Sequence, residues 1–367
     1  MTPAEHTQTT ETFDGYIRDR RQAGVRNHVL VLPSVICSSI VSESITSAVP
    51  EAVCASHDHG CGQIGSDKRQ TRQTLINVAE NPNIAGVVVV GLGCETLDSQ
   101  NIAADLSVPV KHTAIQTAGG TQAAIDEGTH AARELVTQAG DGDRATVDLE
   151  ELTLGIATTD VSTSTVQTVH PLVGGLCRRV LDAGGRVAVS ATNAFISTES
   201  RNECLTVDDG TAARLGSFLR TVRAGPQATG PDGSLSGTNL TQLFANEPIH
   251  EVVSYGDQIT LDSGVAVVET TSAFEEAATG LVAAGAQLIL HGTAAGIPTG
   301  HPLAPVLKIT GDSETAAALA NDIDIDATEQ GPGRLFESVC TAASGELTAA
   351  EQHGLTTFAI TRSGPSL

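Results

Sequence analysis

AGVVVVG, residues 85–91, is followed directly by Leu92-Gly93-Cys94-Glu95 in this 367-residue chain. Consecutive valines between glycines predict a short strand that is buried on both faces, because β-branched side chains suit a pleated and packed surface. Strands of this kind are typical of a parallel sheet covered by helices. The polar residues after the strand are then placed at its carboxyl end, where ligands bind in such sheets.

The segments around this strand alternate between strand and helix signals. In the first half we predict strands at 28–32, 52–56 and 109–116, and helices from about residue 38, at 66–80 and at 120–139. In the second half we predict strands at 152–156, 186–191, 265–270, 287–291 and 305–310, with helices at 171–183, 273–284 and 313–321. This alternation predicts the α/β class, with mainly parallel sheets flanked by helices.

Composition divides the chain into two domains. The polar run AGDGDRAT at 139–146 indicates a linker, which predicts a first α/β domain over 15–140 and a second over 147–367. Residues 1–14 are polar and lack the basic-then-apolar order of a signal peptide, so we predict a short flexible tail. Residues 226–239 are rich in Gly, Pro, Ser and Thr and predict a long loop.

The charge of the chain excludes some classes of partner. Lys and Arg number 20 against 43 Asp and Glu, which gives a formal net charge of −23. A field of that sign repels nucleic acid and anionic membranes, and no apolar run has the length of a membrane span. We interpret the acidity as an adaptation to a high-salt cytoplasm, where salt screens the repulsion between carboxylates. An anionic substrate then needs a local arginine or metal ion in order to bind.

Chemically distinctive side chains follow each predicted strand of the first domain. They are Cys37 after the first strand, His57, His59 and Cys61 after the second, Cys94 and Glu95 after the third, and Gln116 after the fourth. Because the carboxyl ends of parallel strands meet at one edge of a sheet, we expect these side chains to converge. Thiolate and imidazole favour iron or zinc over magnesium. We therefore predict a metal site made of the three thiols and the glutamate, with the two histidines as catalytic bases beside it.

Simpler interpretations of the same residues stay open. Cysteine is among the most buried residue types and often only fills a gap in a core. Glycines at these positions also suit tight turns between strand and helix, and a histidine beside Asp58 suits a solvated surface. Gly91-Leu92-Gly93 is not a dinucleotide-binding fingerprint, because the third glycine of that motif is missing. The seven cysteines are odd in number and widely spaced, so we expect reduced thiols.

Several blocks of the sequence resemble the altronate/galactarate dehydratase family. They are VRNH at 25–28, HGCG at 59–62, GLGCE at 91–95, GIPTG at 296–300 and APVLK at 304–308. Their order and spacing fit the family from about residue 24 to residue 360. Members of the family remove water from sugar acids such as altronate or galactarate, which gives 2-keto-3-deoxy acids, and they use iron or another divalent metal. A related member is the large subunit of a lyase that removes sulfite from sulfolactate.

The resemblance implies a cytoplasmic, oligomeric hydro-lyase that acts on a sugar acid. It implies iron as the cofactor, either as Fe²⁺ or as an iron–sulfur cluster, or another divalent metal. It also implies a separate small SAF-type subunit, because family members carry such a domain and this sequence begins with the large part. We assign substrate contacts to residues of the matching blocks and of the strand edge, namely Asn27, His28, Gln116, Gly296, Thr299 and Lys308.

The second half departs from the family pattern. A Lys-Cys-Gly-Gly-Ser-Asp block of the family reads ATTDVS at 157–162, and a Ser-Glu-x-Pro-Glu block reads SATNA at 190–194, which removes two carboxylates. We therefore predict that His170, which precedes Pro171 at a helix start, supplies acid–base chemistry from this half. Two other functions remain open. One is a lyase with another leaving group, such as sulfite, and the other is a non-catalytic relative that binds a ligand.

Overall fold

The computed structural model describes residues 11–18, 22–140, 142–197, 205–224, 240–362 and 364. Their strands form two parallel sheets and one antiparallel ribbon. The smaller sheet has the spatial order β3 (Ala52–Cys54), β2 (His28–Pro33), β4 (Ile84–Gly91), β5 (Val110–Ala114). The larger sheet has the order β13 (Ile325–Asp326), β12 (Val306–Thr310), β11 (Leu288–Gly292), β7 (Thr153–Thr158), β8 (Arg186–Ser190), β10 (Gly264–Val268), β9 (Ile249–Val253). The ribbon pairs β1 (Thr12–Tyr16) with β6 (Arg144–Asp148).

Helices connect the strands of each sheet. The first domain contains α1 (Ile36–Ala48), α2 (Gly65–Ala79), α3 (Ser99–Asp105), α4 (Ile115–Ala118) and α5 (Thr121–Ala139). The second contains α6 (His170–Asp182), α7 (Thr192–Ser197), α8 (Asp209–Ala224), α10 (Phe274–Ala283), α11 (Ser313–Ala318), α12 (Pro332–Ala343) and α13 (Ala349–His353). Among the residues that the structure describes, no helix is both long and apolar enough to cross a membrane.

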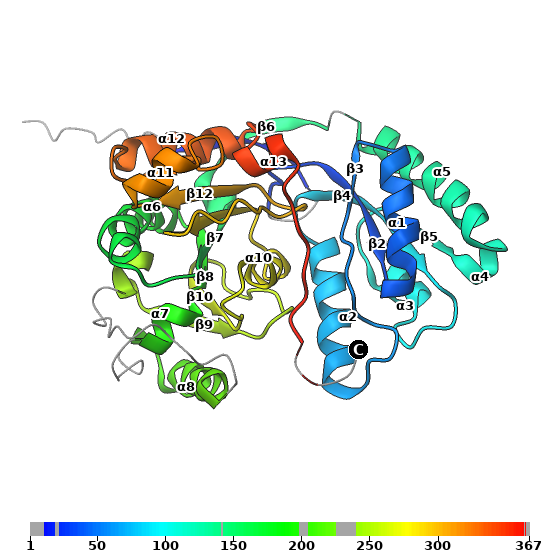
Figure 1. The fold of residues 1–367 in the computed structure, drawn as a ribbon, viewed down its shortest axis with the longest axis horizontal. Helices are drawn as coiled ribbons and strands as arrows, with labels where there is room; N and C mark the ends of the chain where they lie inside the picture. Colours follow the sequence, from blue (N-terminus) through cyan, green and yellow to red (C-terminus); the bar gives the residue numbers. More distant parts are fainter. Residues whose placement is uncertain are drawn as a thin grey trace, which may run out of the picture.

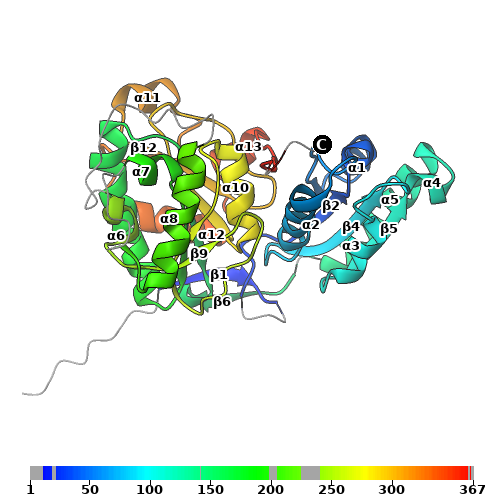
Figure 2. The same cartoon turned by 90° about the horizontal axis from the view of Figure 1, so that it is seen from below.

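The two sheets and their helices lie side by side as two lobes, with α10 and α2 between the sheets (Figures 1 and 2). Helices α1 and α5 cover one face of the smaller sheet, and α2 and α3 cover the other. Helix α2 packs against α10, which covers the facing side of the larger sheet, so that one apolar cluster runs across both domains. The far face of the larger sheet is covered by α6, with α12 packed on α6. The two domains are therefore held together by an apolar core that they share.

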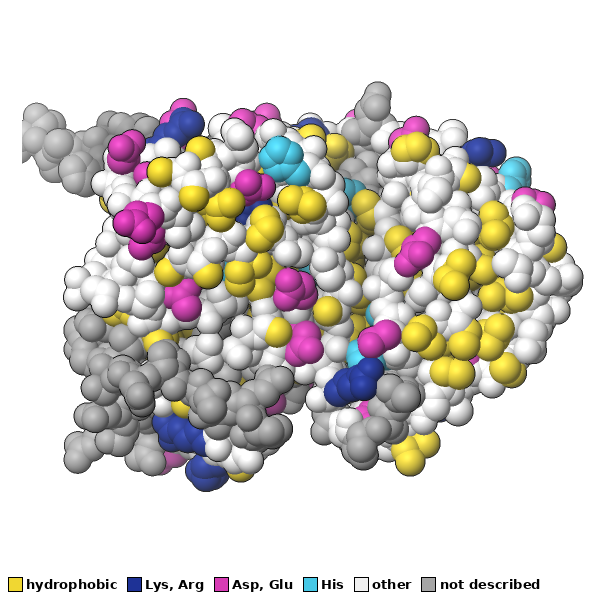
Figure 3. Space-filling model, in the orientation of Figure 1, with side chains coloured by type: hydrophobic (Ala, Val, Ile, Leu, Met, Phe, Trp, Pro, Cys, Tyr) yellow, Lys and Arg dark blue, Asp and Glu magenta, His cyan; other side chains and the backbone are white. Residues whose placement is uncertain are grey.

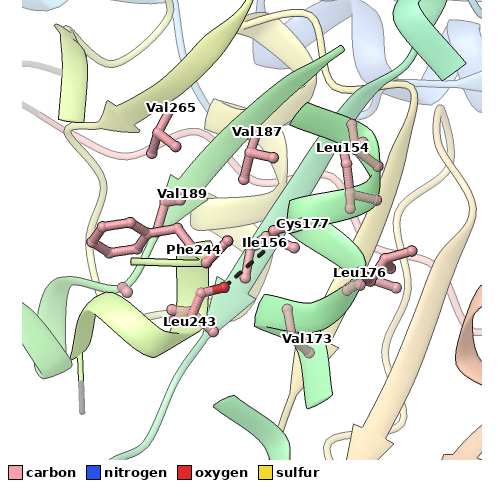
Figure 4. Packing of buried hydrophobic residues seen from close by; sticks show 14 of the residues in the cluster. Leu154, Ile156, Val173, Leu176, Cys177, Val187, Val189, Leu243, Phe244 and Val265 are labelled. Carbon is pink, nitrogen blue, oxygen red and sulfur yellow. Dashed lines mark hydrogen bonds between the residues drawn. The ribbon is translucent and has the colours of Figure 1, made fainter. Parts of the chain in front are cut away.

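The strands are apolar because they are buried on both faces. The four valines of β4 are fully buried and alternate between two clusters, Val87 and Val89 toward α2, and Val88 and Val90 toward α1 and α5. In the larger sheet, Ile156 and Val189 pack on α6 and on Phe244 (Figure 4). Each buried side chain of this size stabilises the fold by about 1.5–3 kcal/mol relative to exposure.

The predicted α/β class with parallel sheets is confirmed, and the predicted elements agree with the structure within a few residues. The structure also differs from the prediction in several places. Residues 12–14, predicted as part of a flexible tail, lie in β1, where Phe13 is buried in the core of the second domain. The predicted strand at 109–116 ends at Ala114, because residues 115–118 form the short helix α4. Strand β6 begins at Arg144, inside the run 139–146 that was predicted as a linker, because these residues pair with β1. Strands β9 and β13 and helices α3, α7, α8, α12 and α13 were not predicted. Residues 1–10 of the predicted tail and the loop at 226–239 lie outside the described residues.

Candidate active site

A cavity of about 1120 Å³ opens between the carboxyl edges of the two sheets. The first domain contributes residues that follow β2 and β3, and the second domain contributes residues that follow β8 and β10. The C-terminal segment, residues 355–362, runs between the two lobes and adds residues 358–362 to the lining (Figure 1). Figure 3 shows this face of the molecule hollowed between the lobes. The cavity, called the interdomain cleft below, therefore lies where an open α/β sheet binds ligands.

His57 is held by backbone atoms on both sides of its ring. Its Nε2 lies 2.9 Å from Pro33 O, and its Nδ1 accepts a hydrogen bond from the His59 backbone N–H at 3.2 Å. These contacts fix the tautomer, with the proton on Nε2. Burial lowers the pKa of His57 to about 4. His57 is therefore neutral at pH 7 and holds the shape of the 57–61 loop, which leaves it no ring nitrogen for a substrate.

His59 has a different environment in the wall of the same cleft. Its Nε2 lies 2.6 Å from Ile360 O and donates to that carbonyl, since a carbonyl only accepts. Its Nδ1 is buried and has no hydrogen-bond partner. The neutral imidazole therefore keeps an unused lone pair on a buried Nδ1, and such a nitrogen can accept a proton from a group that reaches it. Of the two histidines in the cleft wall, His59 is the one that keeps a ring nitrogen without a hydrogen-bond partner.

The three predicted thiol ligands lie beside this loop. Cys37 Sγ and Cys61 Sγ are 3.8 Å apart, and the backbone between them is joined by a hydrogen bond from Ile36 N to His59 O at 2.8 Å. The pKa of Cys37 is raised by desolvation, by its hydrogen bond to Cys61, and by the nearby charges of Cys61 and Cys94. All three cysteines are exposed and reduced. The predicted convergence at one sheet edge is thus present for the Cys37–Cys61 pair, with Cys94 close by.

The sulfur atoms of these cysteines are the kind of ligand that iron or zinc prefers. Two thiolates that share a tetrahedral ion with bonds near 2.3 Å lie about 3.8 Å apart, which is the separation of Cys37 and Cys61. In the part of the chain that the structure describes, no three or more His, Cys, Asp or Glu side chains are placed together so that they could hold a metal ion, so Cys94 and Glu95 do not complete a site with the Cys37–Cys61 pair in this arrangement. Glu95, the fourth predicted ligand, accepts hydrogen bonds from Ser34 Oγ and from the backbone N–H groups of Leu92 and Gly93. Its carboxylate shapes the turn that carries Cys94.

The predicted substrate contacts are spread over several places. Gln116 packs on Gly93, where an added Cβ would lie 2.9 Å from Gln116 Cβ, so it lies against the turn that precedes Cys94. Lys308 is fully buried, and its Nζ donates to Pro298 O at 2.7 Å, which holds the loop that contains Gly296 and Thr299. These three residues of the second domain do not line the interdomain cleft. Lys308 serves there as an internal tie of the loop.

Asn27 and His28 lie at the opposite edge of the smaller sheet. His28 begins β2, and Asn27 lines a separate cavity of about 200 Å³ with Tyr16 and Arg18. His170 is fully buried at the start of α6 and is also absent from the cleft lining. The structure thus separates these three predicted site residues from His59 and the thiols.

Several residues that line the interdomain cleft were not predicted from the sequence. The second domain contributes the hydroxyl and amide side chains of Thr192, Asn193, Thr270, Thr271 and Ser272, with Glu276 beside them. The rule of polar residues after strands applies to 192–193 and 270–272 and could have found them. The residues Phe358–Arg362 follow no strand, so that rule does not reach them.

A hollow at the carboxyl edges of two parallel sheets, with His57 and His59 in its wall, lies where α/β enzymes bind their ligands. Cys37, Cys61 and Cys94 do not line this hollow, although Ile36, next to Cys37, does. Two family descriptions match the chain, "D-galactarate dehydratase/Altronate hydrolase, second domain" over residues 15–140 and "D-galactarate/Altronate dehydratase, C-terminal" over residues 241–366. Together they cover more than half of the 367 residues. The chain belongs to the galactarate/altronate dehydratase family, and it is an enzyme of the hydro-lyase class.

Full-length relatives agree with this assignment. The altronate dehydratase of Bacillus subtilis is 23% identical, with 99% of this chain and 80% of that protein aligned. The altronate dehydratase of Escherichia coli is 24% identical over 96% of this chain and 78% of that protein. The (2R)-sulfolactate sulfo-lyase subunit beta of Chromohalobacter salexigens is 24% identical over 96% of this chain and 97% of that protein. A ketoreductase domain from the bacillaene assembly line superposes with a TM-score of only 0.21 at 10% identity, over 90% of this chain and 71% of that one, which is too little likeness to bear on the fold.

Proposed function

We propose that this chain is the large catalytic part of a dehydratase that acts on a sugar acid such as altronate or galactarate in the interdomain cleft. The observation that carries the proposal is that His59 lines that cleft and that its buried Nδ1 has no hydrogen-bond partner. Thr270, Thr271 and Ser272 line the same space, and polar residues of this kind suit a polyhydroxylated ligand. Thr270 Oγ1 also lies 2.6 Å from Ser190 Oγ, and Thr271 Oγ1 donates to Glu276. The family assignment supplies the reaction class.

In the proposed mechanism His59 moves one proton. Nδ1 takes the proton from the carbon next to the substrate carboxylate, while Ile360 O holds the Nε2 proton in place. The imidazolium then returns that proton to the hydroxyl on the adjacent carbon, which leaves as water. The resulting enol tautomerises to the 2-keto-3-deoxy acid, so no oxidant or reductant is needed. His57 keeps the loop in the shape that aims His59.

We further propose that iron, or another divalent metal, is held by Cys37, Cys61 and Cys94. Their soft donors and the 3.8 Å spacing of the first two support this choice over magnesium. A bound metal ion supplies positive charge that stabilises the anion formed when the substrate loses its proton. Glu95 holds the turn that carries Cys94, and Gln116 packs against that turn.

A small SAF-type subunit is the proposed partner. The relative from Chromohalobacter salexigens is called a subunit beta and aligns over 97% of its length with this chain. That correspondence also favours a second candidate function, a sulfo-lyase, because 157–162 and 190–194 depart from the pattern of the sugar-acid enzymes. The acidic composition suits assembly and activity in a high-salt cytoplasm.

The two functions are separated by their products. The chain, purified without oxygen, supplied with Fe²⁺ and with the small subunit in molar salt, is assayed on altronate, galactarate and (2R)-sulfolactate. A dehydratase produces a 2-keto-3-deoxy acid from the first two acids, and a sulfo-lyase releases sulfite from the third. Sulfite release alone would replace the first proposal by the second, and turnover of none of the three acids would contradict both.

A further inference from the structure

The interdomain cleft has a marked shortage of positive charge. Among the described residues that line it, Arg362 is the one Lys or Arg side chain, whereas Asp58 and Glu276 bring carboxylates. The whole chain carries a net charge of −23, and such a field opposes the approach of an anion. An anionic ligand in this cleft therefore depends on the cation at position 362 unless a metal ion compensates.

Arg362 is placed by contacts with both domains. Two residues before it, Ile360 is buried and its carbonyl accepts the hydrogen bond from His59 Nε2 at 2.6 Å. One residue before it, Thr361 O accepts from Gln70 Nε2 of α2 at 2.7 Å, and Thr361 N donates to Tyr255 Oη of the second domain at 3.3 Å. The backbone that carries the guanidinium is thus fixed beside the proposed base.

The present partner of Arg362 is easily exchanged. Arg362 Nη2 donates to Asp58 Oδ2 at 3.1 Å, and the two side chains are 45% and 66% exposed. An ion pair this exposed contributes little net stability, because water and salt screen it. A guanidinium offers five N–H donors in a fork that matches a carboxylate, so a substrate carboxylate can replace Asp58 with two hydrogen bonds.

We propose that Arg362 is a specificity-determining residue that binds the carboxylate of the substrate, in competition with Asp58. The inference rests on the proposed function in one respect, the choice of a hydroxylated organic acid as the ligand. In this arrangement the C-terminal segment provides two neighbouring groups. Ile360 O orients the base, and Arg362 anchors the acid end of the substrate on the same side of the cleft.

The test measures binding and turnover separately. The probe is galactarate, titrated calorimetrically into the metal-free chain, with the uncharged polyol galactitol as a second ligand. Arg362→Gln should weaken galactarate binding about tenfold or more, the loss expected for a charge-assisted hydrogen bond. Arg362→Lys should fall between, because a lysine keeps the charge but loses the fork. In turnover assays the same variants should raise KM more than they lower kcat.

Two further variants separate a binding role from a structural one. Asp58→Asn removes the competing carboxylate and should tighten galactarate binding, a gain that general loosening of the segment would not produce. Arg334→Gln removes the same charge from α12, where Arg334 pairs with Glu337, and should bind galactarate as the unchanged chain does. Galactitol binding should be insensitive to all of these changes.

The outcomes distinguish this inference from the proposed function. Unchanged galactarate affinity in Arg362→Gln, an equal loss for galactitol, or no galactarate binding by the unchanged chain would each overturn the role of Arg362. If Arg362→Gln loses galactarate binding while the unchanged chain turns over no acid, the anion site stands and the dehydratase proposal fails. If the unchanged chain and Arg362→Gln dehydrate galactarate with the same KM, the dehydratase proposal stands and the proposed role of Arg362 fails.

Discussion

His57 and His59 are two residues apart, and their rings stack with centroids 6.2 Å apart, yet their surroundings give them different roles. Both ring nitrogens of His57 are bound to backbone atoms, whereas His59 keeps Nδ1 without a partner. Sequence alone cannot make this distinction, because it depends on the carbonyl of Ile360, which is 301 positions away from His59. The same limit explains why His170 was a reasonable candidate by its place at a helix start and is nevertheless buried away from the cleft.

The first prediction concerns these histidines. His59→Gln keeps a donor for Ile360 O but removes the base, so turnover should fall by about a hundredfold or more, as for other general bases. His170→Ala should instead lower stability, since it leaves a cavity at a fully buried position, and turnover per folded molecule should be unchanged. The measurements are kcat on whichever acid the unchanged chain turns over, and the midpoint of unfolding in urea.

His130→Gln is the matched control for both changes. His130 lies on α5 with its side chain 78% exposed, and its ion pair with Glu134 is on the surface. The control should leave kcat and the urea midpoint as they are. Equal turnover in His59→Gln and His130→Gln would remove His59 from the mechanism, and a kcat loss in a fully stable His170→Ala would restore His170 to it.

A second prediction at this scale concerns the thiols. Cys61→Ser and Cys94→Ser should lower bound iron after anaerobic loading and dialysis by at least about tenfold, because even outer-shell partners of a metal contribute that much. Cys177→Ala is the control. Cys177 is fully buried in the second domain, its Sγ donates to Leu243 O at 3.5 Å (Figure 4), and burial raises its pKa to about 12, so it is an inert thiol.

Iron per chain, measured by elemental analysis, decides this prediction. Cys177→Ala should retain the iron of the unchanged chain although it loses some stability. If Cys61→Ser and Cys94→Ser also retain it, the thiol cluster is not the metal site, and the simpler interpretation of these cysteines as turn residues holds.

Among the helices and strands, those whose apolar sequence pattern reflects burial by their own neighbours could be predicted from the sequence. The strands β2, β4, β8 and β11 are mostly apolar because helices cover both their faces. The convergence of Cys37 with Cys61 follows from the parallel topology. Strand β6 was missed because its residues are mostly exposed and polar. The C-terminal segment was missed for another reason: its position depends on the contact between domains, which leaves no periodicity in the sequence.

The loop Asn81-Pro82-Asn83, between α2 and β4, shows how that contact is made. Asn83 Oδ1 accepts from the N–H groups of Val25 and Arg26, and its Nδ2 donates to Gln287 O and Leu303 O in the second domain. Asn83 is fully buried. Its neighbour Asn81 likewise donates to the carbonyls at 282 and 286. One loop therefore satisfies backbone groups of both domains.

The third prediction follows from this loop. Asn83→Ala strands buried donors and acceptors in both domains and should destabilise the chain by about 3 kcal/mol, since one unsatisfied buried group costs about 1–3 kcal/mol. The urea midpoint measures it. Asn101→Ala, on the exposed surface of α3, is the control and should change the midpoint little. A midpoint for Asn83→Ala equal to that of Asn101→Ala would mean that water replaces these bonds.

In the whole molecule, the buried core stabilises the folded state, whereas the negative surface charge destabilises it. The buried clusters hold the two domains together, while a net charge of −23 makes the surface repel itself. The repulsion acts over distances that salt can shorten, since the screening length falls from roughly 30 Å at 0.01 M salt to about 3 Å at 1 M. Buried pairs such as Arg26 with Glu351, whose side chains are 7% and 15% exposed, are screened much less.

The fourth prediction is that stability rises with salt. The thermal midpoint should increase by several degrees between low salt and molar sodium chloride, because screening weakens the repulsion between carboxylates while the buried pairs keep their attraction. The experiment is a pair of salt series, one at pH 7 and one near pH 5. Because the sequence pI is about 4.7, the net charge is small near pH 5, and the salt dependence there should be clearly weaker. Equal slopes at the two pH values would assign the effect to a general action of salt on apolar surface. Midpoints that stay flat at pH 7 would mean that the acidic surface adds no net repulsion to the folded state.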